Sequence, residues 1–173
     1  MAEFQPGALI LIVDDDDDDR SLLSRLLTRR GYRPVRAESG EAALRAYAME
    51  RPDVCVVDQA MPGMDGIALL AELRRRDTQA QVIIMTGFGS IDRAVAAMRA
   101  GAIDFLTKPV DEGVLTALIE KARAIDAVMV ENRNLRAELE DRFSFANLVS
   151  VSAEMDRVLA LARQAARHDV TVL

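Results

Sequence analysis

The fold of this chain is decided by the stretch Val54-Cys55-Val56-Val57-Asp58-Gln59-Ala60-Met61-Pro62-Gly63-Met64-Asp65-Gly66. Its four small apolar residues are typical of a strand buried on both faces, as the strands of parallel sheets are. Asp58 ends this strand, at the edge where parallel sheets bind their ligands. Asp is also a common turn residue, so this stretch by itself leaves open that Asp58 only begins a loop.

Composition limits the size and class of the protein. With 173 residues, half of them hydrophobic, the chain has room for one ordinary domain with an appendage, or for two very small domains. Its 22 basic and 28 acidic residues give a net charge of −6, which argues against a broad nucleic-acid-binding surface within this stretch. No apolar run is long enough to span a membrane, and Met1 to Gly7 lacks the features of a signal peptide.

The chain has a single cysteine and a single histidine, which excludes several kinds of chemistry. Cys55 lies in the predicted buried strand, so no disulfide can form within the chain and a reduced, cytoplasmic location is expected. Because His168 is the single histidine, a His-rich metal site is excluded and Ser-His catalysis is not expected. Chemistry based on oxygen ligands remains.

Four further strands and five helices are predicted around the central strand. Leu9 to Val13 is a second apolar run, followed by the acidic run Asp14 to Asp19. Helical spacing begins at Arg20 and stops at Gly31, and the last four acids are expected to form a solvated turn where that helix begins. The alternation predicts a parallel sheet with helices on both faces and right-handed crossovers. The other predicted strands span residues 34–37, 82–85 and 103–106, and the other helices residues 40–50, 67–75, 90–99 and 111–141.

Polar side chains follow four of the predicted strands and are expected at one edge of the sheet. They are Asp14 and Asp15 after the first strand, Asp58 after the third, Thr86 after the fourth and Lys108 after the fifth. Three carboxylates this close raise one another's pKa unless a cation lies among them, and oxygen ligands select Mg²⁺ over zinc. With a lysine charge and a hydroxyl nearby, they predict a phosphoryl-transfer site without a nucleotide-binding loop. Asp58, presented singly at a strand tip, is the predicted nucleophile that forms an acyl phosphate.

Several motifs together resemble the response-regulator receiver domain. The resemblance covers roughly Ala8 to Arg123. It implies an α/β fold of the flavodoxin-like, doubly wound kind, with a five-stranded parallel sheet in the order 2-1-3-4-5. The motifs are Asp14-Asp15 followed by Arg20, Asp58 followed by Met61-Pro62-Gly63-Met64-Asp65-Gly66, Met85-Thr86-Gly87, and Lys108-Pro109.

The resemblance implies a role for each residue at the strand tips. Asp58 would be the phospho-acceptor, loaded by a sensor histidine kinase. Asp14 and Asp15 would be the acidic pair that holds Mg²⁺ together with Asp58, and the backbone carbonyl of Ala60 would be a further metal ligand. Lys108 would contact the phosphate.

Thr86 and Phe105 would form the switch pair of the family. In receivers the residue at Thr86 is drawn toward the phosphoryl group, the aromatic residue at Phe105 swings inward, and the face made by the fourth helix and fifth strand repacks. The Lys108-Pro109 peptide bond is expected to be cis. This sequence departs from many relatives at two positions. Ala60 has no larger side chain beside the phosphoryl group, and Phe105 lacks the hydroxyl of the commoner tyrosine.

Beyond the receiver, the sequence resembles the NtrC/DctD-like transcriptional activators that work with the σ54 form of RNA polymerase. Glu131 to Leu135 resembles their linker, and Leu148 to Met155 with Asp169 to Leu173 resembles the opening of their AAA+ ATPase domain. A glycine-rich phosphate loop and a DNA-binding helix-turn-helix do not occur in this sequence. The resemblance therefore implies that contacts with σ54 polymerase and DNA belong to further domains, and that this chain is not an enzyme.

The resemblance also sets the predicted domain boundaries. Because an unpaired apolar strand rarely ends a protein, Val170 to Leu173 is interpreted as a cut inside a larger one. The predicted domains are a receiver at 1–124, a coiled-coil linker helix at 125–145 and an N-terminal fragment of an AAA+ ATPase at 146–173.

The predicted linker helix carries a seam for a homodimer. Apolar and polar residues recur along it at alternating steps of four and three, the spacing that keeps one side facing a partner helix. The first turns of this seam are expected to pack on the receiver's own sheet instead. The seam consists of Leu118, Ala122, Ile125, Met129, Asn132, Arg136 and Leu139.

Two other classes of protein can be built from the same acids. An EF-hand would begin at Asp14, but it needs Gly in place of Asp19 and Glu in place of Arg25. A haloacid-dehalogenase-like, Mg²⁺-dependent phosphatase is the stronger alternative, with Asp14 as nucleophile and Asp16 as general acid. It does not explain the turn from Met61 to Gly66.

Overall fold

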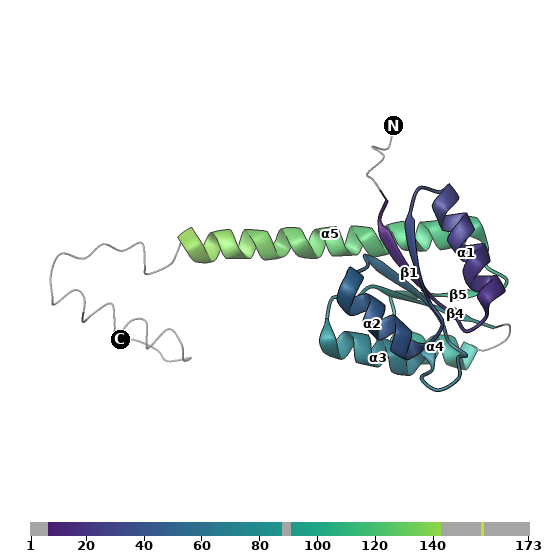
Figure 1. The fold of residues 1–173 in the computed structure, drawn as a ribbon. Coiled ribbons are helices and arrows are strands. Elements are labelled where there is room, and N and C mark those ends of the chain that lie inside the picture. Colours follow the sequence, from purple (N-terminus) through teal and green to yellow (C-terminus); the bar gives the residue numbers. More distant parts are fainter. Residues whose placement is uncertain (1–6, 88–90, 143–156, 158–173) are drawn as a thin grey trace. The chain divides into compact units, whose positions relative to one another are not determined.

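The computed structural model describes residues 7–87, 91–142 and 157 of the chain. Within these ranges, strands and helices alternate in the predicted order (Figure 1). The strands are β1 Leu9–Val13, β2 Arg33–Ala37, β3 Val54–Asp58, β4 Val82–Thr86 and β5 Asp104–Thr107. The helices are α1 Asp17–Arg29, α2 Gly40–Glu50, α3 Gly66–Arg76, α4 Ile91–Arg99 and α5 Glu112–Arg142.

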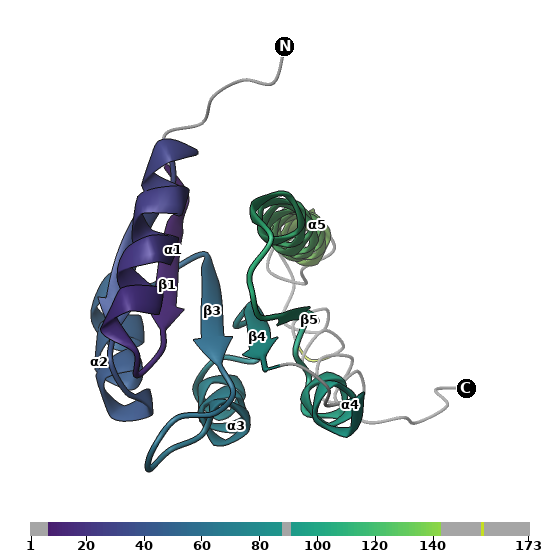
Figure 2. The ribbon, with the colours of Figure 1, turned by 90° about the vertical axis from the view of Figure 1, so that its right-hand side faces the viewer.

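The five strands form one parallel sheet in the order β2-β1-β3-β4-β5, which confirms the predicted flavodoxin-like fold. Helices cover both faces (Figure 2). Cys55 and Val57 of β3 pack in a cluster with residues of α2, α3 and α4. Val54 and Val56 point to the other face and pack with residues of α1 and α5. The central strand is therefore buried on both sides, as its unbroken apolar run predicts.

α1 begins at Asp17, earlier than the predicted Arg20, and the acidic run explains the difference. Asp16 is the N-cap, and its carboxylate accepts hydrogen bonds from the backbone N–H of Asp18 at 2.8 Å and of Asp19 at 3.1 Å. The acidic first turn suits the positive end of the helix dipole. The expectation that these acids begin a helix is confirmed, but they are part of its first turn.

The chain turns back sharply between β3 and α3, which fixes where Asp58 lies. The N–H of Gly66 donates to the carbonyl of Gln59 at 3.0 Å, and the Asp65 carboxylate caps α3 by accepting from Ala68 at 2.7 Å. A Cβ atom on Gly66 would come within 2.5 Å of the carbonyl oxygen of Asp58. Only glycine allows this close approach of backbone to backbone.

α5 has 31 residues and two different surroundings. In its first part, Leu115, Ile119 and Ala122 are fully buried in the cluster that includes α1. Leu118 packs partly against the same cluster, so these turns lie on the five-stranded sheet, as expected. The contact pattern divides the chain after Ala127. In the later part of α5, exposed apolar side chains recur at Val128, Met129, Val130 and Leu135.

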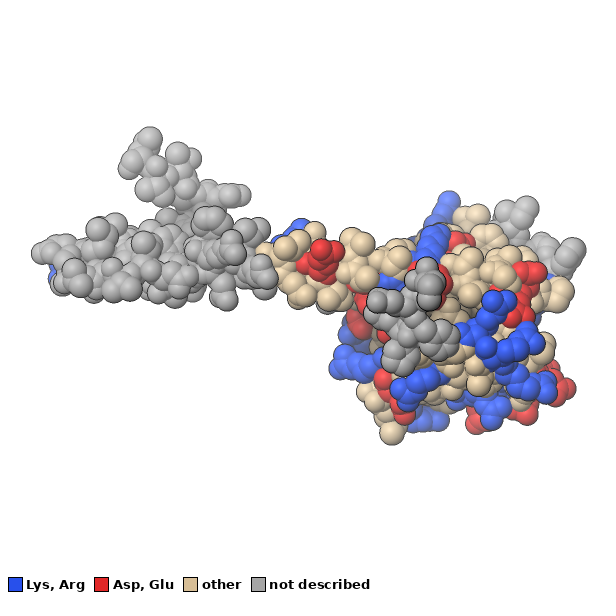
Figure 3. Space-filling view, turned by 90° about the horizontal axis from the view of Figure 1, so that it is seen from above, with Lys and Arg blue, Asp and Glu red and all other residues tan. Residues whose placement is uncertain are grey.

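Several predictions fall outside the described residues. They include the ATPase fragment at 146–173 apart from Arg157, and the side chain of Leu139. Among the residues that are described, no helix is long and apolar enough to cross a membrane. On the face seen in Figure 3, Lys and Arg side chains lie among Asp and Glu side chains.

Candidate functional site

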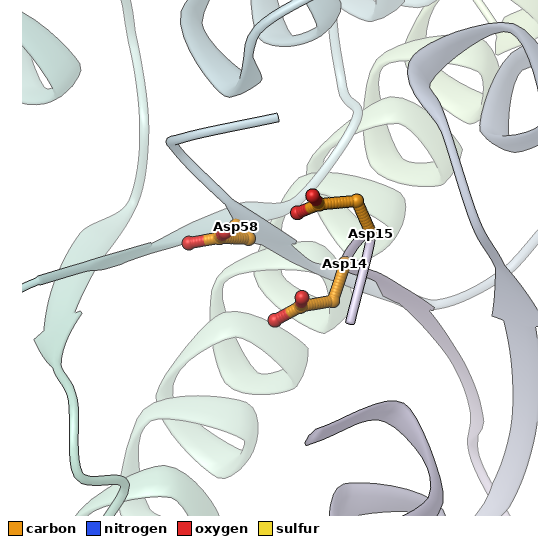
Figure 4. Close-up of side chains that lie close together, drawn as sticks. All are labelled: Asp14, Asp15 and Asp58. Atoms are coloured by element: carbon orange, nitrogen blue, oxygen red, sulfur yellow. The ribbon is translucent and has the colours of Figure 1, made fainter. Parts of the chain in front are cut away.

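Three carboxylates from two strand ends meet at the carboxyl edge of the sheet (Figure 4). Asp14 follows β1, Asp15 comes next in the chain, and Asp58 ends β3. A ligand oxygen from each lies within 4.8 Å of those of the other two. Asp14 and Asp58 are buried, whereas Asp15 is exposed, so the cluster opens to solvent on one side. The sheet therefore brings together the three acids that the sequence predicts.

Lys108 brings a positive charge to these acids. Its ammonium lies 2.7 Å from Oδ2 of Asp14, 2.9 Å from Oδ2 of Asp19 and 3.6 Å from Oδ1 of Asp58. Its backbone N–H donates to the carbonyl of Thr86 at 2.8 Å, which ties the segment after β5 to the end of β4. The Lys108-Pro109 bond is cis, as the resemblance implies.

The pKa shifts of Asp58 and Lys108 show how charge is balanced at the site. Burial raises the pKa of Asp58, and the nearby charge of Lys108 only partly offsets this while Asp14 adds to it. Burial by itself would lower the pKa of Lys108, but hydrogen bonds to Asp14 and Asp19 raise it above its ordinary value. Lys108 therefore stays charged at neutral pH, and the clustered carboxylates still outnumber it.

The donor atoms of the cluster fit a hard divalent cation. All three side chains offer carboxylate oxygens within one small site, which is the chemistry that Mg²⁺ prefers. Ala60, the predicted carbonyl ligand, is exposed two residues beyond the end of β3. Its carbonyl as a metal ligand stays a prediction.

Arg20 holds the start of α1 against the end of β1. This buried guanidinium donates from Nη1 to the backbone carbonyl of Asp14 at 2.5 Å and from Nη2 to Asp17 at 2.9 Å. The Asp14 carboxylate in turn accepts from the N–H of Asp16 at 2.9 Å. Asp14 is thus fixed at both its carbonyl and its side chain before any ligand binds.

The two predicted switch residues lie on neighbouring strands. Thr86 ends β4 beside β3 and is buried, with its hydroxyl donating to the carbonyl of Gly87 at 3.3 Å. Phe105 pairs with Ile84 across β4 and β5, and 38% of its surface is exposed. Thr86 is therefore at the edge of the sheet with the acids, and Phe105 is one strand further out.

Asp19 is a residue near the site that sequence reasoning missed. The acidic run marked it only as one of several helix-starting acids, whereas its carboxylate reaches Lys108. In a run of six aspartates, residue type alone does not indicate which one contacts Lys108. The useful signal is helix geometry, because the first turn of α1 carries residue 19 back toward the end of β1.

The fold and this acidic site together define the class of the protein. The chain belongs to the family of response regulator receiver domains. The family model described as the response regulator receiver domain matches residues 10–120. This match favours the receiver interpretation over the phosphatase alternative.

Particular relatives are transcriptional regulators. The chain is 40% identical over 169 residues to the transcriptional regulatory protein GlrR of Escherichia coli, covering 98% of this chain and 36% of that protein. It is 36% identical over 154 residues to the DNA-binding transcriptional regulator NtrC of Klebsiella pneumoniae, covering 89% and 32%. The chain thus spans about a third of the length of these curated relatives.

Solved structures give the same result. A response regulator receiver domain protein from Clostridium thermocellum is 31% identical with a TM-score of 0.68, covering 70% of this chain and 98% of that chain. NtrX from Brucella abortus, in complex with ADP, is 29% identical with a TM-score of 0.71 and covers 92% of this chain and 35% of that chain. The similarity to NtrX extends over more of this chain than the similarity to the receiver domain protein does.

Proposed function

We propose that this chain is the phospho-accepting receiver of a two-component system, and that Asp58 takes the phosphoryl group from a sensor histidine kinase. A carboxylate oxygen of Asp58 attacks the phosphorus of the kinase phosphohistidine. The P–N bond breaks, its electron pair returns to the imidazole nitrogen, and an acyl phosphate forms on Asp58. The observation that carries this proposal is the position of Asp58, at a strand end beside Asp14 and Asp15 with Lys108 at 3.6 Å.

The other residues of the site balance charge in this reaction. The Lys108 ammonium would meet the negative charge that the phosphoryl oxygens bring, and the Thr86 hydroxyl would donate a hydrogen bond to them. Asp14, Asp15, Asp58 and the carbonyl of Ala60 would hold Mg²⁺. When bound, the ion neutralises charge on the transferred phosphoryl group.

We further propose how the signal leaves the site. Thr86 and Phe105 would act as the switch pair, and Phe105, which is more than a third exposed, would become buried when it moves inward. The output would be a σ54-type transcription-activating ATPase in the cytoplasm, with contacts to polymerase and DNA made by further domains. The relatives named above as transcriptional regulators support this, as does the share of their length that lies outside the match. The domains would be the receiver at 1–124, the linker at 125–145 and the ATPase fragment at 146–173.

A homodimer formed through the linker helix completes the proposal. Its support is the exposure of apolar side chains in the later part of α5, where Val128 is 65% and Leu135 is 53% exposed, each one position before a residue of the predicted seam. Met129, on the predicted seam, is 41% exposed. Asn132 and Arg136 on the same seam weaken such a coiled coil but favour one register.

Phosphorylation by a small donor tests the assignment of Asp58. Incubation with Mg²⁺ and acetyl phosphate should add one phosphoryl group to the chain, measured by intact mass. Asp58→Asn should abolish the adduct, because the amide is not a nucleophile for phosphorus. An adduct that survives in Asp58→Asn and disappears in Asp14→Asn would instead support the phosphatase alternative.

A further inference from the structure

The Lys108 ammonium lies closer to Asp19 than to the proposed phospho-acceptor. Its distances are 2.9 Å to Asp19 and 3.6 Å to Asp58. Asp19 belongs to the first turn of α1, not to a strand end, and its backbone N–H is held by the Asp16 carboxylate at 3.1 Å. The backbone of Asp19 is therefore held at the start of α1, from which its carboxylate reaches Lys108.

The contact between Lys108 and Asp19 is one that a stronger partner can break. The Asp19 side chain is 45% exposed and that of Lys108 is 25% exposed, so water competes for both groups. The bond from Lys108 to Asp14 differs, since the Asp14 side chain is only 1% exposed. Of the two short contacts, the one with Asp19 is the weaker.

We propose that Asp19 is a positioning residue that holds the Lys108 ammonium on the α1 side of the site before phosphorylation, and that it thereby slows phosphoryl acceptance by Asp58. This inference rests on the proposed function of Asp58. When Asp58 attacks the phosphorus of an acyl phosphate, the bond from phosphorus to the acyl oxygen breaks and the carboxylate product leaves with the electron pair. The phosphoryl oxygens now on Asp58 must draw Lys108 away from Asp19.

Asp18→Asn is the matched control for Asp19→Asn. Asp18 is the exposed neighbour in the same helical turn, and its removal changes the formal charge by the same amount. In the part of the chain that the structure describes, Lys108 pairs with Asp14, Asp19 and Asp58 but not with Asp18. Both variants weaken the attraction of the acidic turn for Mg²⁺, so rates are compared at saturating Mg²⁺.

The measurement is the initial rate of Asp58 phosphorylation as a function of acetyl phosphate concentration. Asp19→Asn should raise the maximal rate by up to about fivefold, the factor that a partly exposed ion pair supplies. Asp18→Asn should change the maximal rate less than twofold. A general charge effect would alter the half-saturating donor concentration in both variants alike. Asp19→Glu, which keeps the carboxylate, should return the maximal rate toward that of the parent chain.

A double-mutant cycle tests whether Asp19 acts through Lys108. In a Lys108→Ala background, Asp19→Asn should accelerate the residual reaction no more than Asp18→Asn does. The inference is overturned if Asp19→Asn is no faster than Asp18→Asn, or if its acceleration persists without Lys108. A parent chain that takes no phosphoryl group at Asp58 gives a different result, because it overturns the proposed function itself.

Discussion

Replacing Lys108 by methionine should destabilise the metal-free protein by about 2 kcal/mol at neutral pH. Removing one partner of a buried ion pair costs about 3–5 kcal/mol, because the other charge stays buried. Asp14, with its side chain 1% exposed, is such a partner. The side chain of Lys108 is 25% exposed and that of Asp19 is 45% exposed, so solvent screens part of their interaction with each other. The ion pair with Asp19 therefore contributes less than about 1 kcal/mol to stability.

The loss should depend on pH with a defined sign. Burial raises the pKa of Asp58 and the charge of Lys108 opposes that rise, so the pKa should rise further in Lys108→Met. A carboxyl group with a higher pKa in the folded than in the unfolded protein destabilises the fold above that pKa. This destabilisation decreases as pH falls below the folded pKa and is gone once pH is below the unfolded pKa of about 4. The variant should therefore regain stability relative to the parent as pH is lowered from 7 to about 5.

Mg²⁺, like a lower pH, should reduce the difference in stability between Lys108→Met and the parent. A ligand at ten times its Kd stabilises the folded protein by about 1.4 kcal/mol, and a more negative site binds Mg²⁺ more tightly. Because the parent also binds Mg²⁺, only the difference in affinity counts, and tenfold tighter binding by Lys108→Met would recover about 1.4 kcal/mol of the loss. Urea unfolding in EDTA at pH 7 measures the loss of stability. The same measurement in EDTA at pH 5 gives its dependence on pH, and in Mg²⁺ at pH 7 its recovery by the metal.

Lys121→Met provides the matched control. Lys121 is 51% exposed and pairs with Asp104 at 2.7 Å, away from the three clustered carboxylates. Its replacement should cost less than about 1 kcal/mol and should not respond to Mg²⁺. The electrostatic account of the site is refuted if Lys108→Met is as stable as the parent in EDTA. It is also refuted if the loss is the same in Mg²⁺ and at pH 5.

Three further predictions concern the metal, the turn after β3 and the linker. Asp15→Ala should abolish Mg²⁺-dependent NMR shifts while Asp17→Ala retains them, and equal loss from both would mean that the acidic run binds cations diffusely. Gly66→Ala should cost about 1–3 kcal/mol in urea unfolding, because its Cβ would lie 2.5 Å from the Asp58 carbonyl oxygen; Gly87→Ala, whose Cβ would meet no atom of the described residues within 4 Å, should cost less. In sedimentation at tens of micromolar, the full chain should be a dimer and a chain that ends at Ala124 should be a monomer. If both chains are monomeric, the proposed dimer seam of the linker is refuted.

Much of the fold could be predicted because buried parallel strands have a distinctive pattern. Val54 to Val57 is apolar at every position and is buried on both faces. The order of the strands came from the resemblance of the motifs to a known family, since no periodicity in the sequence specifies which strands pair. The start of α1 was misplaced because Asp17 to Asp19 carry no apolar spacing, and capping rather than burial decides where that helix begins.

The site was predictable to the extent that it depends on strand ends. Asp14 and Asp58 had to be neighbours once β1 and β3 were parallel and adjacent, because the carboxyl ends of such strands lie at one edge. The position of the Lys108 ammonium was not predictable in this way. Its flexible side chain can choose among several acids, and the choice of Asp14 and Asp19 over Asp58 depends on helix geometry 89 residues away in the sequence.

The acidic run illustrates how identical residues take different roles when the chain changes direction. β1 ends with Asp14 buried against Lys108, and the chain then turns into α1, where Asp16 caps the helix. Backbone hydrogen bonds from Asp19 and Asp18 lower the pKa of Asp16, so its charge is already used by the helix. A substitution of the whole run would therefore remove the cap of α1, two proposed metal ligands and two partners of Lys108 together. Only single replacements, compared with a neighbour in the same turn, can separate these contributions.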